Sequence, residues 1–284
     1  MATGSHDYDI KMYDYGGMTA GEGGYKPFAS WEPTGSYHVR PPRASQSVVR
    51  PKIDQPYLSI QIHDLEYSPN GEKLLVITGT TQPQVYDREG EPRSVQADHC
   101  SRPRPGHPAQ LTLCPASYRS RRDGRGTKYV KGDPYIRDMK HTSGHVAELT
   151  SGRWNPKNGA EFVTASNDST VRIWDVENLR KQKVVISVKS KDRGTRTKVT
   201  ACAYSPDGKN IGATGLDGTF HVWSTSGNFA RPSLTNEGAH VKGSETSCVT
   251  FSIDGRTVLT RGGDDTVKRE SRFHLHSFSS FFTG

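Results

Sequence analysis

The stretch Ser166-Asn-Asp-Ser-Thr-Val-Arg-Ile-Trp-Asp175 decides the fold. Val171 and Ile173 alternate with polar residues, which is the pattern of a half-buried strand. The Asn-Asp-Ser at 167–169 is rich in turn formers, and the apolar run Phe162-Val-Thr-Ala165 comes directly before it. Two such runs joined by a short polar turn predict a β-hairpin whose second strand ends in Trp-Asp.

This hairpin pattern recurs along the chain. The copies are Ser5-His-Asp-Tyr-Asp-Ile-Lys-Met-Tyr-Asp14, a degenerate Thr81-Gln-Pro-Gln-Val-Tyr-Asp87, Gly215-Leu-Asp-Gly-Thr-Phe-His-Val-Trp-Ser224 and Gly262-Gly-Asp-Asp-Thr-Val-Lys268. A second phrase, an aromatic residue running into a Gly-terminated turn, precedes the later copies: Tyr67-Ser-Pro-Asn-Gly71, Trp154-Asn-Pro-Lys-Asn-Gly159, Tyr204-Ser-Pro-Asp-Gly208 and Phe251-Ser-Ile-Asp-Gly255. Trp174 and Trp223 are 49 residues apart, and Tyr204 and Phe251 are 47 apart. A fixed period of this size is typical of tandem structural repeats.

In both phrases and in their order, the chain resembles the WD-repeat β-propeller family. The resemblance implies an all-β fold, a WD-repeat β-propeller of four-stranded blades. About five blades are recognisable, so the ring is expected to be incomplete.

The repeats predict a single propeller domain over residues 1–268. Its blades are expected near residues 5–35, 57–90, 127–180, 196–230 and 239–268. Residues 91–126 are rich in proline and arginine, which predicts a disordered basic insertion. After Lys268 the pattern requires an apolar residue and Trp-Asp; because the chain has Arg-Glu-Ser-Arg there, residues 269–284 are predicted to be a non-repeat tail.

A narrower resemblance is to the gastrulation-defective-type WD-repeat proteins. It is carried by Asp9-Ile-Lys-Met-Tyr-Asp14, Val85-Tyr-Asp-Arg-Glu-Gly90, Lys131-Gly-Asp-Pro-Tyr-Ile-Arg-Asp-Met139, Thr142-Ser-Gly-His145 and Gly152-Arg-Trp-Asn-Pro156. It implies a nuclear scaffold that binds protein partners in a multi-subunit complex, in a DNA-damage ubiquitin-ligase assembly or in the pre-mRNA splicing machinery, with the cytoplasm as the alternative location. The insertion and the tail depart from the family pattern, which indicates a truncated or mis-spliced form.

Bulk composition excludes several classes of protein. The chain has 284 residues, a net charge of +8, 32% hydrophobic residues and a mean hydropathy of -0.74. No apolar run is long enough to cross a membrane. The four cysteines lack Cys-x-x-Cys spacing, which favours reduced thiols in a cytosolic or nuclear protein.

One set of polar residues could be mistaken for catalytic groups: His145, Asp168 and Trp174, with Thr164 or Ser166. The family resemblance implies that they hold the blade together, with the histidine bonding the aspartate and the aspartate orienting a hydroxyl that reaches the indole N–H. The same structural network is expected to include Asp217, Trp223, His240 and Asp264. We therefore expect no enzyme activity, no catalytic residue, no cofactor and no small-molecule substrate.

Two further clusters have weaker support. His99, Cys100, His107 and Cys114 lack the paired spacing of a zinc site, so a loop is favoured over a metal site.

A basic run could contact phosphates, and nucleic-acid binding through residues 181–198 is the alternative function. A solvated loop is favoured because no base-stacking aromatic residues are interleaved with the basic ones, which are Lys181, Lys183, Lys189, Lys191, Arg193, Arg196 and Lys198.

Overall fold

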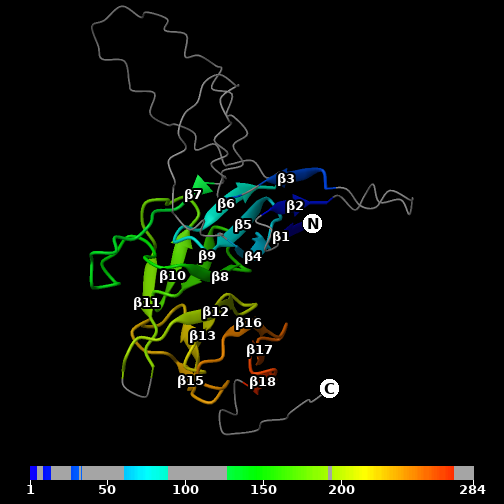
Figure 1. Cartoon of the computed structure of the whole chain (residues 1–284). Helices are drawn as coiled ribbons and strands as arrows, with labels where there is room; N and C mark the ends of the chain where they lie inside the picture. Colours follow the sequence, from blue (N-terminus) through cyan, green and yellow to red (C-terminus); the bar gives the residue numbers. More distant parts are fainter. Residues whose placement is uncertain are drawn as a thin grey trace, which may run out of the picture.

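Five antiparallel sheets make up the part of the chain that the computed structural model describes, residues 1–4, 9–13, 27–31, 33, 61–88, 127–190 and 194–271 (Figure 1). The first three sheets contain β1 (Ala2–Gly4), β2 (Ile10–Met12) and β3 (Ala29–Trp31); β4 (Ile62–Tyr67), β5 (Lys73–Thr78), β6 (Gln84–Asp87) and β7 (Thr127–Lys128); and β8 (Leu149–Trp154), β9 (Glu161–Ser166), β10 (Thr170–Asp175) and β11 (Val184–Ser187). The last two contain β12 (Val199–Tyr204), β13 (Asn210–Gly215), β14 (Phe220–Ser224) and β15 (Leu234–Asn236); and β16 (Thr246–Phe251), β17 (Thr257–Gly262) and β18 (Val267–Ser271). The all-β prediction is confirmed.

Successive sheets pack in chain order through their first strands. Strand β1 contacts β4, β4 contacts β8, β8 contacts β12, and β12 contacts β16. Figure 1 shows the sheets following one another from the blue end of the chain to the red end. This is the arrangement of propeller blades. That the ring is incomplete stays a prediction.

The sheets are copies of one unit down to their irregularities. In each of the last four sheets the register between the first and second strands shifts at the same place, between Ile62/Asp64, Leu149/Ser151, Val199/Ala201 and Thr246/Cys248. Such a bulge bends the strand and re-aims the side chains next to it. A shared bulge therefore indicates a shared backbone design.

The turn between the second and third strands needs a left-handed residue in three of the sheets. Ser169, Gly218 and Asp265 occupy equivalent positions, with φ of 68°, 80° and 59°. Glycine adopts this conformation without strain, and Asp tolerates it through its short polar side chain. Ser169 is the unusual choice, and it follows Asp168, whose carboxylate caps the turn by accepting the Thr170 N–H at 2.9 Å.

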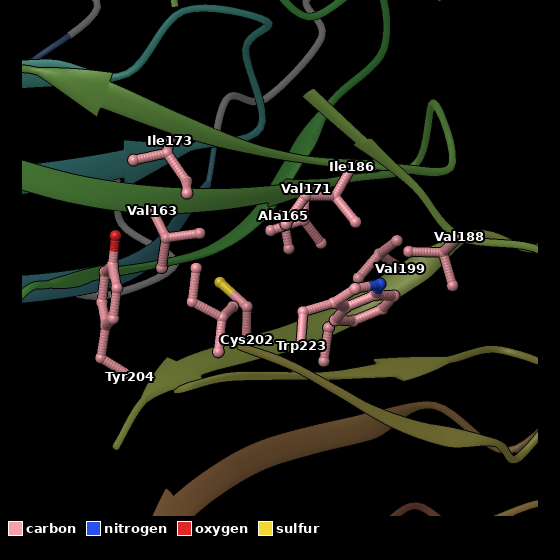
Figure 2. Packing of buried hydrophobic residues seen from close by; sticks show 12 residues of the cluster. Val163, Ala165, Val171, Ile173, Ile186, Val188, Val199, Cys202, Tyr204 and Trp223 are labelled. Carbon is pink, nitrogen blue, oxygen red and sulfur yellow. The ribbon is translucent and has the colours of Figure 1, made fainter. Parts of the chain in front are cut away.

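A large aromatic side chain at one position of the third strand packs between neighbouring sheets in the second, third and fourth sheets. Trp174 pairs with Phe162, Trp223 with Ile211 and Tyr86 with Leu74. Trp174 packs in a cluster with the second sheet, Tyr86 with the first and Trp223 with the third. Figure 2 shows Trp223 beside Val199, below Val171 and Ile186 of the third sheet. The two tryptophans thus have matching surroundings.

The observed sheets correct the expected blade boundaries. Strands β1, β11 and β15 lie a few residues outside the expected 5–35, 127–180 and 196–230 blades. Thr127 and Lys128 form β7, which pairs with Gln84 and Val85, so they complete the second sheet rather than opening the 127–180 blade. Strand β18 continues to Ser271, three residues into the expected 269–284 tail, because ladder pairing with β17 uses backbone groups and does not require Trp-Asp. The predicted insertion, the candidate metal cluster and the rest of the tail lie outside the described residues.

No helix among the described residues has the length and apolar character needed to cross a membrane.

Candidate functional site

The polar residues of the third sheet form one buried chain of hydrogen bonds. The Trp174 indole N–H donates to Thr164 Oγ1 at 2.8 Å, and Thr164 Oγ1 lies 2.8 Å from His145 Nε2. On the other side of the ring, His145 Nδ1 lies 2.9 Å from Asp168 Oδ2. The side chains of His145 and Asp168 are 0% and 1% exposed.

The order of this chain corrects the expected one. The family resemblance implies that the aspartate orients the hydroxyl next to the tryptophan, but His145 lies between Asp168 and Thr164. An imidazole can bridge them because its two nitrogens point in opposite directions. The carboxylate of Asp168 is already occupied by the Val146 N–H at 3.2 Å and by the Thr170 hydroxyl at 2.6 Å.

Burial sets the charge of the histidine, and nearby contacts set that of the aspartate. Burial lowers the pKa of His145 and outweighs the opposing charge of Asp168, so the ring is neutral near pH 7. A neutral ring donates from Nδ1 to Asp168 and accepts the Thr164 hydroxyl proton at Nε2. Burial alone would raise the pKa of Asp168, but the contacts from His145, Thr170 and Arg172 together lower it to about 2.

This arrangement suits support of the fold rather than nucleophilic chemistry. A triad hydroxyl must reach a substrate beside an oxyanion hole, whereas Thr164 is fully buried and bonded on both sides. The buried thiol of Cys202 is also unsuited to act as a nucleophile, since burial raises its pKa to about 12. Within the described ranges, His, Cys, Asp and Glu side chains form no group of three or more suited to a metal ion.

The fifth sheet repeats the network without a tryptophan. His240 Nδ1 lies 3.1 Å from Asp264 Oδ1, and His240 Nε2 lies 2.9 Å from Thr260 Oγ1. Glu270, which pairs with Val258, stands where the third sheet has Trp174. The fifth sheet thus keeps the hydrogen bonds among histidine, aspartate and threonine, although it lacks the tryptophan.

The fourth sheet keeps the tryptophan, Trp223, but its polar residues are bonded differently. Ala213 stands where the third sheet has Thr164, so the hydroxyl that would link Trp223 to a histidine is missing. Asp217 bonds the Thr219 hydroxyl at 2.7 Å, and that hydroxyl lies 3.0 Å from His221 Nε2. Asp217 is thus bonded within its turn and through Thr219 to His221, by a route that differs from the one in the third sheet.

A buried arginine ties a long loop to the third sheet. Arg172 is 0% exposed and donates to the Thr142 carbonyl at 2.9 Å, to the Thr142 hydroxyl at 2.6 Å and to the Met139 carbonyl at 3.0 Å. Burial lowers its pKa to about 10, so it remains a cation. Gly132 and Gly144 close the base of the loop, since a Cβ on either would lie 2.2 Å from a backbone oxygen of the facing segment.

Beyond this anchor the loop presents an exposed tip. Tyr135 is 92% exposed, and its N–H donates to Asp133 Oδ1 at 2.9 Å. At the far side, Asp138 accepts the Lys140 N–H at 3.0 Å and lies 2.8 Å from His141 Nδ1. Local bonds of this kind hold a loop in one conformation, and we define residues 132–144 as the anchored loop. Sequence reasoning missed it, although an arginine on a strand of otherwise apolar spacing was the available signal.

The structure describes part of the predicted basic run. Lys189, Arg196 and Lys198 are exposed, and the backbones of Lys189 and Arg196 form an isolated antiparallel bridge. Lys191 and Arg193 lie outside the described residues.

A groove of about 460 Å³, which Lys189 helps to line, lies between β11 and residues 227–230. Its apolar part includes Val184 and Phe229, and its charged part is lysine, namely Lys140, Lys181, Lys183 and Lys189. We call this the edge groove. It joins the anchored loop through Lys140.

Acidification should weaken the fold through His145. The pKa of His145 is lowered from 6.5 in the folded chain, so below about pH 6.5 the unfolded chain binds a proton that the folded chain does not. We expect the free energy of unfolding, measured by urea titration, to be smaller at about pH 5.5 than at about pH 7.5. A second loss should follow between about pH 4 and pH 2, where the unfolded aspartate is protonated and Asp168 is not.

The matched control is the exposed His141, which also contacts an aspartate. His145→Ala should flatten the slope of stability against pH, with the residual slope coming partly from His221, whose pKa burial also lowers. His141→Ala should leave the free energy of unfolding at about pH 7.5 nearly unchanged. Equal slopes in the wild type and in His145→Ala would contradict the assignment.

Comparison with known proteins agrees with the repeat geometry. Residues 137–175 and 187–224 match the family model described as WD domain, G-beta repeat. The chain is 35% identical over 268 residues to WD repeat-containing protein 70 of Xenopus tropicalis, and 35% identical over 268 residues to that of Bos taurus. These alignments cover 94% of this chain and 33% and 32% of the relatives. The gastrulation defective protein 1 homolog of Drosophila melanogaster is 30% identical over 100% of this chain, which covers 35% of that protein. The chain thus spans about a third of the length of these relatives.

Proposed function

The chain is a WD40-repeat protein, homologous over most of its length to WD repeat-containing protein 70 and to the gastrulation defective protein 1 homolog, and on that premise we propose that it is a non-catalytic scaffold for protein partners in a nuclear complex. The complex is one of the DNA-damage ubiquitin-ligase or pre-mRNA splicing machinery.

The anchored loop is the observation that carries this proposal. Its base is held by the buried Arg172, and its tip offers the ring of Tyr135 to solvent. An isolated exposed apolar side chain needs no explanation. A tyrosine on a loop fixed before binding is different, because little conformational entropy is lost on association and tyrosine is enriched among the residues that dominate interface energy.

Truncating this side chain should reduce partner binding without weakening the fold. With tagged protein in nuclear extract, Tyr135→Ala is expected to lower the recovery of its main partners, quantified by mass spectrometry, by about tenfold or more. The free energy of unfolding should change by less than about 0.5 kcal/mol, as is usual for an exposed position.

The matched control is Ile253→Ala, because Ile253 is 98% exposed and lies in the turn between β16 and β17 of the fifth sheet. That variant should recover the same partners as the wild type. If Tyr135→Ala also recovered them fully, the anchored loop would not be the partner site. If the wild type recovered none, the scaffold proposal itself would fail.

Nucleic-acid binding is the alternative function, and the lysines of the edge groove are the observation that favours it. The same groove offers little to bases, since Phe229, its one aromatic lining residue, is half-buried against the core between the third and fourth sheets. Single-strand binders combine basic grooves with exposed stacking rings.

A further inference from the structure

The strand β11 forms an open edge of the third sheet. Its described partner is β10, and Figure 1 shows β11 on the outer side of that sheet. The Val188 N–H donates to the Ser169 carbonyl at 2.9 Å, which sets the alternation of the ladder. By this alternation the backbone groups of Ile186 face β10, and those of Val185 and Ser187 face away from it. In the part of the chain that the structure describes, no strand pairs with this outer side.

The side chains along this edge also alternate. Lys181, Lys183 and Lys189 are exposed, and they share their parity with Val185 and Ser187, which are half-buried. If the strand is extended by two residues at its C-terminal end, Val185, Ser187 and Lys189 lie on one face of it. At the other end Lys183 interrupts the alternation, because its N–H donates to the Ile173 carbonyl at 2.8 Å, and Lys181 lines the groove beyond it. That face borders the edge groove.

The charge of the groove is largely uncompensated. Of its four lysines, Lys183 forms an ion pair with Glu161. Lys140 lies near Asp138, whose carboxylate is engaged by His141. Among described residues, the side chains of Lys181 and Lys189 form no salt bridge.

From these observations we propose that the edge groove binds an acidic, extended segment of a protein partner, which adds to β11 as a further strand. This inference rests on the proposed scaffold function and names the chemistry of one partner. The partner's backbone bonds the outward groups of Val185 and Ser187. Its alternate Glu or Asp side chains meet Lys181 and Lys189, and its apolar side chains pack on Val184 and Phe229.

The same lysines explain the selectivity of such a site. Lysines on an open edge keep two copies of one chain from pairing, because like charges repel across the new ladder. They attract a strand of opposite charge for the same reason. A nucleic acid would satisfy the charges but would leave the outward backbone groups of β11 without a ladder partner.

The test uses the full chain and synthetic probes followed by fluorescence anisotropy. The main probe is a labelled peptide of about eight residues in which Glu and Val alternate, since a strand of this length spans the edge. Its controls are a block isomer with all Glu residues before the Val residues, and a single-stranded oligouridine of similar charge. We expect the alternating peptide to bind about tenfold or more tightly than either control.

Two variants separate backbone pairing from charge. Val185→Pro removes the outward N–H and spares the ladder to β10, as proline can on an edge strand. The double variant Lys181→Glu/Lys189→Glu reverses the charge and keeps the backbone. Each should weaken peptide binding about tenfold or more. The control Lys157→Glu/Lys209→Glu, at exposed lysines on the turns of the third and fourth sheets, should stay within about twofold.

Each contrary result overturns the proposal in its own way. Tighter binding of oligouridine would assign the groove to nucleic acid. Equal binding of the block isomer, or no effect of both Val185→Pro and the charge reversal, would exclude strand addition. If the charge-reversed chain lost the peptide but recovered every nuclear partner, the groove would not be a partner site and the scaffold function would stand. If the wild type bound the peptide but recovered no partner, the scaffold function would fail.

Discussion

Replacing Trp174 with alanine is expected to lower the free energy of unfolding by about 3–5 kcal/mol, the usual cost of truncating a large buried aromatic side chain. Trp174 is 0% exposed. It stacks on Phe162 at a centroid distance of 6.3 Å and meets the edge of Tyr129 at 5.4 Å. Its removal leaves a cavity between the second and third sheets and deprives Thr164 of a donor.

Chemical denaturation followed by circular dichroism measures this loss. Tyr135→Ala is the control, because it truncates an aromatic residue that is 92% exposed and should change stability by less than about 0.5 kcal/mol. Similar effects of the two truncations would contradict the placement of Trp174 between the sheets.

Replacing His145 with alanine should lower the free energy of unfolding by about 3–5 kcal/mol, because it strands a buried charge. Asp168 would lose its contact with the ring, and the Thr164 hydroxyl would lose its acceptor. Each uncompensated buried group costs about 1–3 kcal/mol by itself. The loss should be seen in equilibrium unfolding at about pH 7.5, where the ring of the wild type is neutral.

His141→Ala is the matched control for this variant. His141 lies four residues away and also contacts an aspartate, Asp138, but its side chain is 79% exposed. Exposed ion pairs contribute about 0–1 kcal/mol, so stability should barely change. A folded, fully stable His145→Ala protein that had lost an enzymatic activity would refute the structural role.

The sequence predicts the repeated unit well because its signals are local. Alternating residues, the Gly-terminated turns and the aromatic strand ends each lie within a few positions of one another, so the hairpins of the third and fourth sheets follow from pattern alone. The family resemblance added the pairing of His145 with Asp168, which are 23 residues apart. It placed the aspartate next to the hydroxyl, whereas geometry puts the ring there.

What the sequence missed depends on contacts between distant segments. Strand β7 joins the second sheet because Thr127 pairs with Val85 across the whole 91–126 segment, which no local pattern reveals. Arg172 resembles an exposed polar residue of an alternating strand, but the loop at 139–142 covers it and supplies its acceptors. The edge groove needs β11 and residues 227–230 together. The sequence therefore did not predict the anchored loop, and of the edge groove it indicated the lysines but not the hollow that they line.

The central claim is that the polar residues of the repeat form one hydrogen-bonded support for the blade. The most direct test is the coupling energy between His145 and Thr164, from unfolding of His145→Ala, Thr164→Val and the double variant. Side chains in one network are expected to couple by about 1–3 kcal/mol. Additive effects, within about 0.5 kcal/mol, would show that the two side chains act independently and would contradict the account.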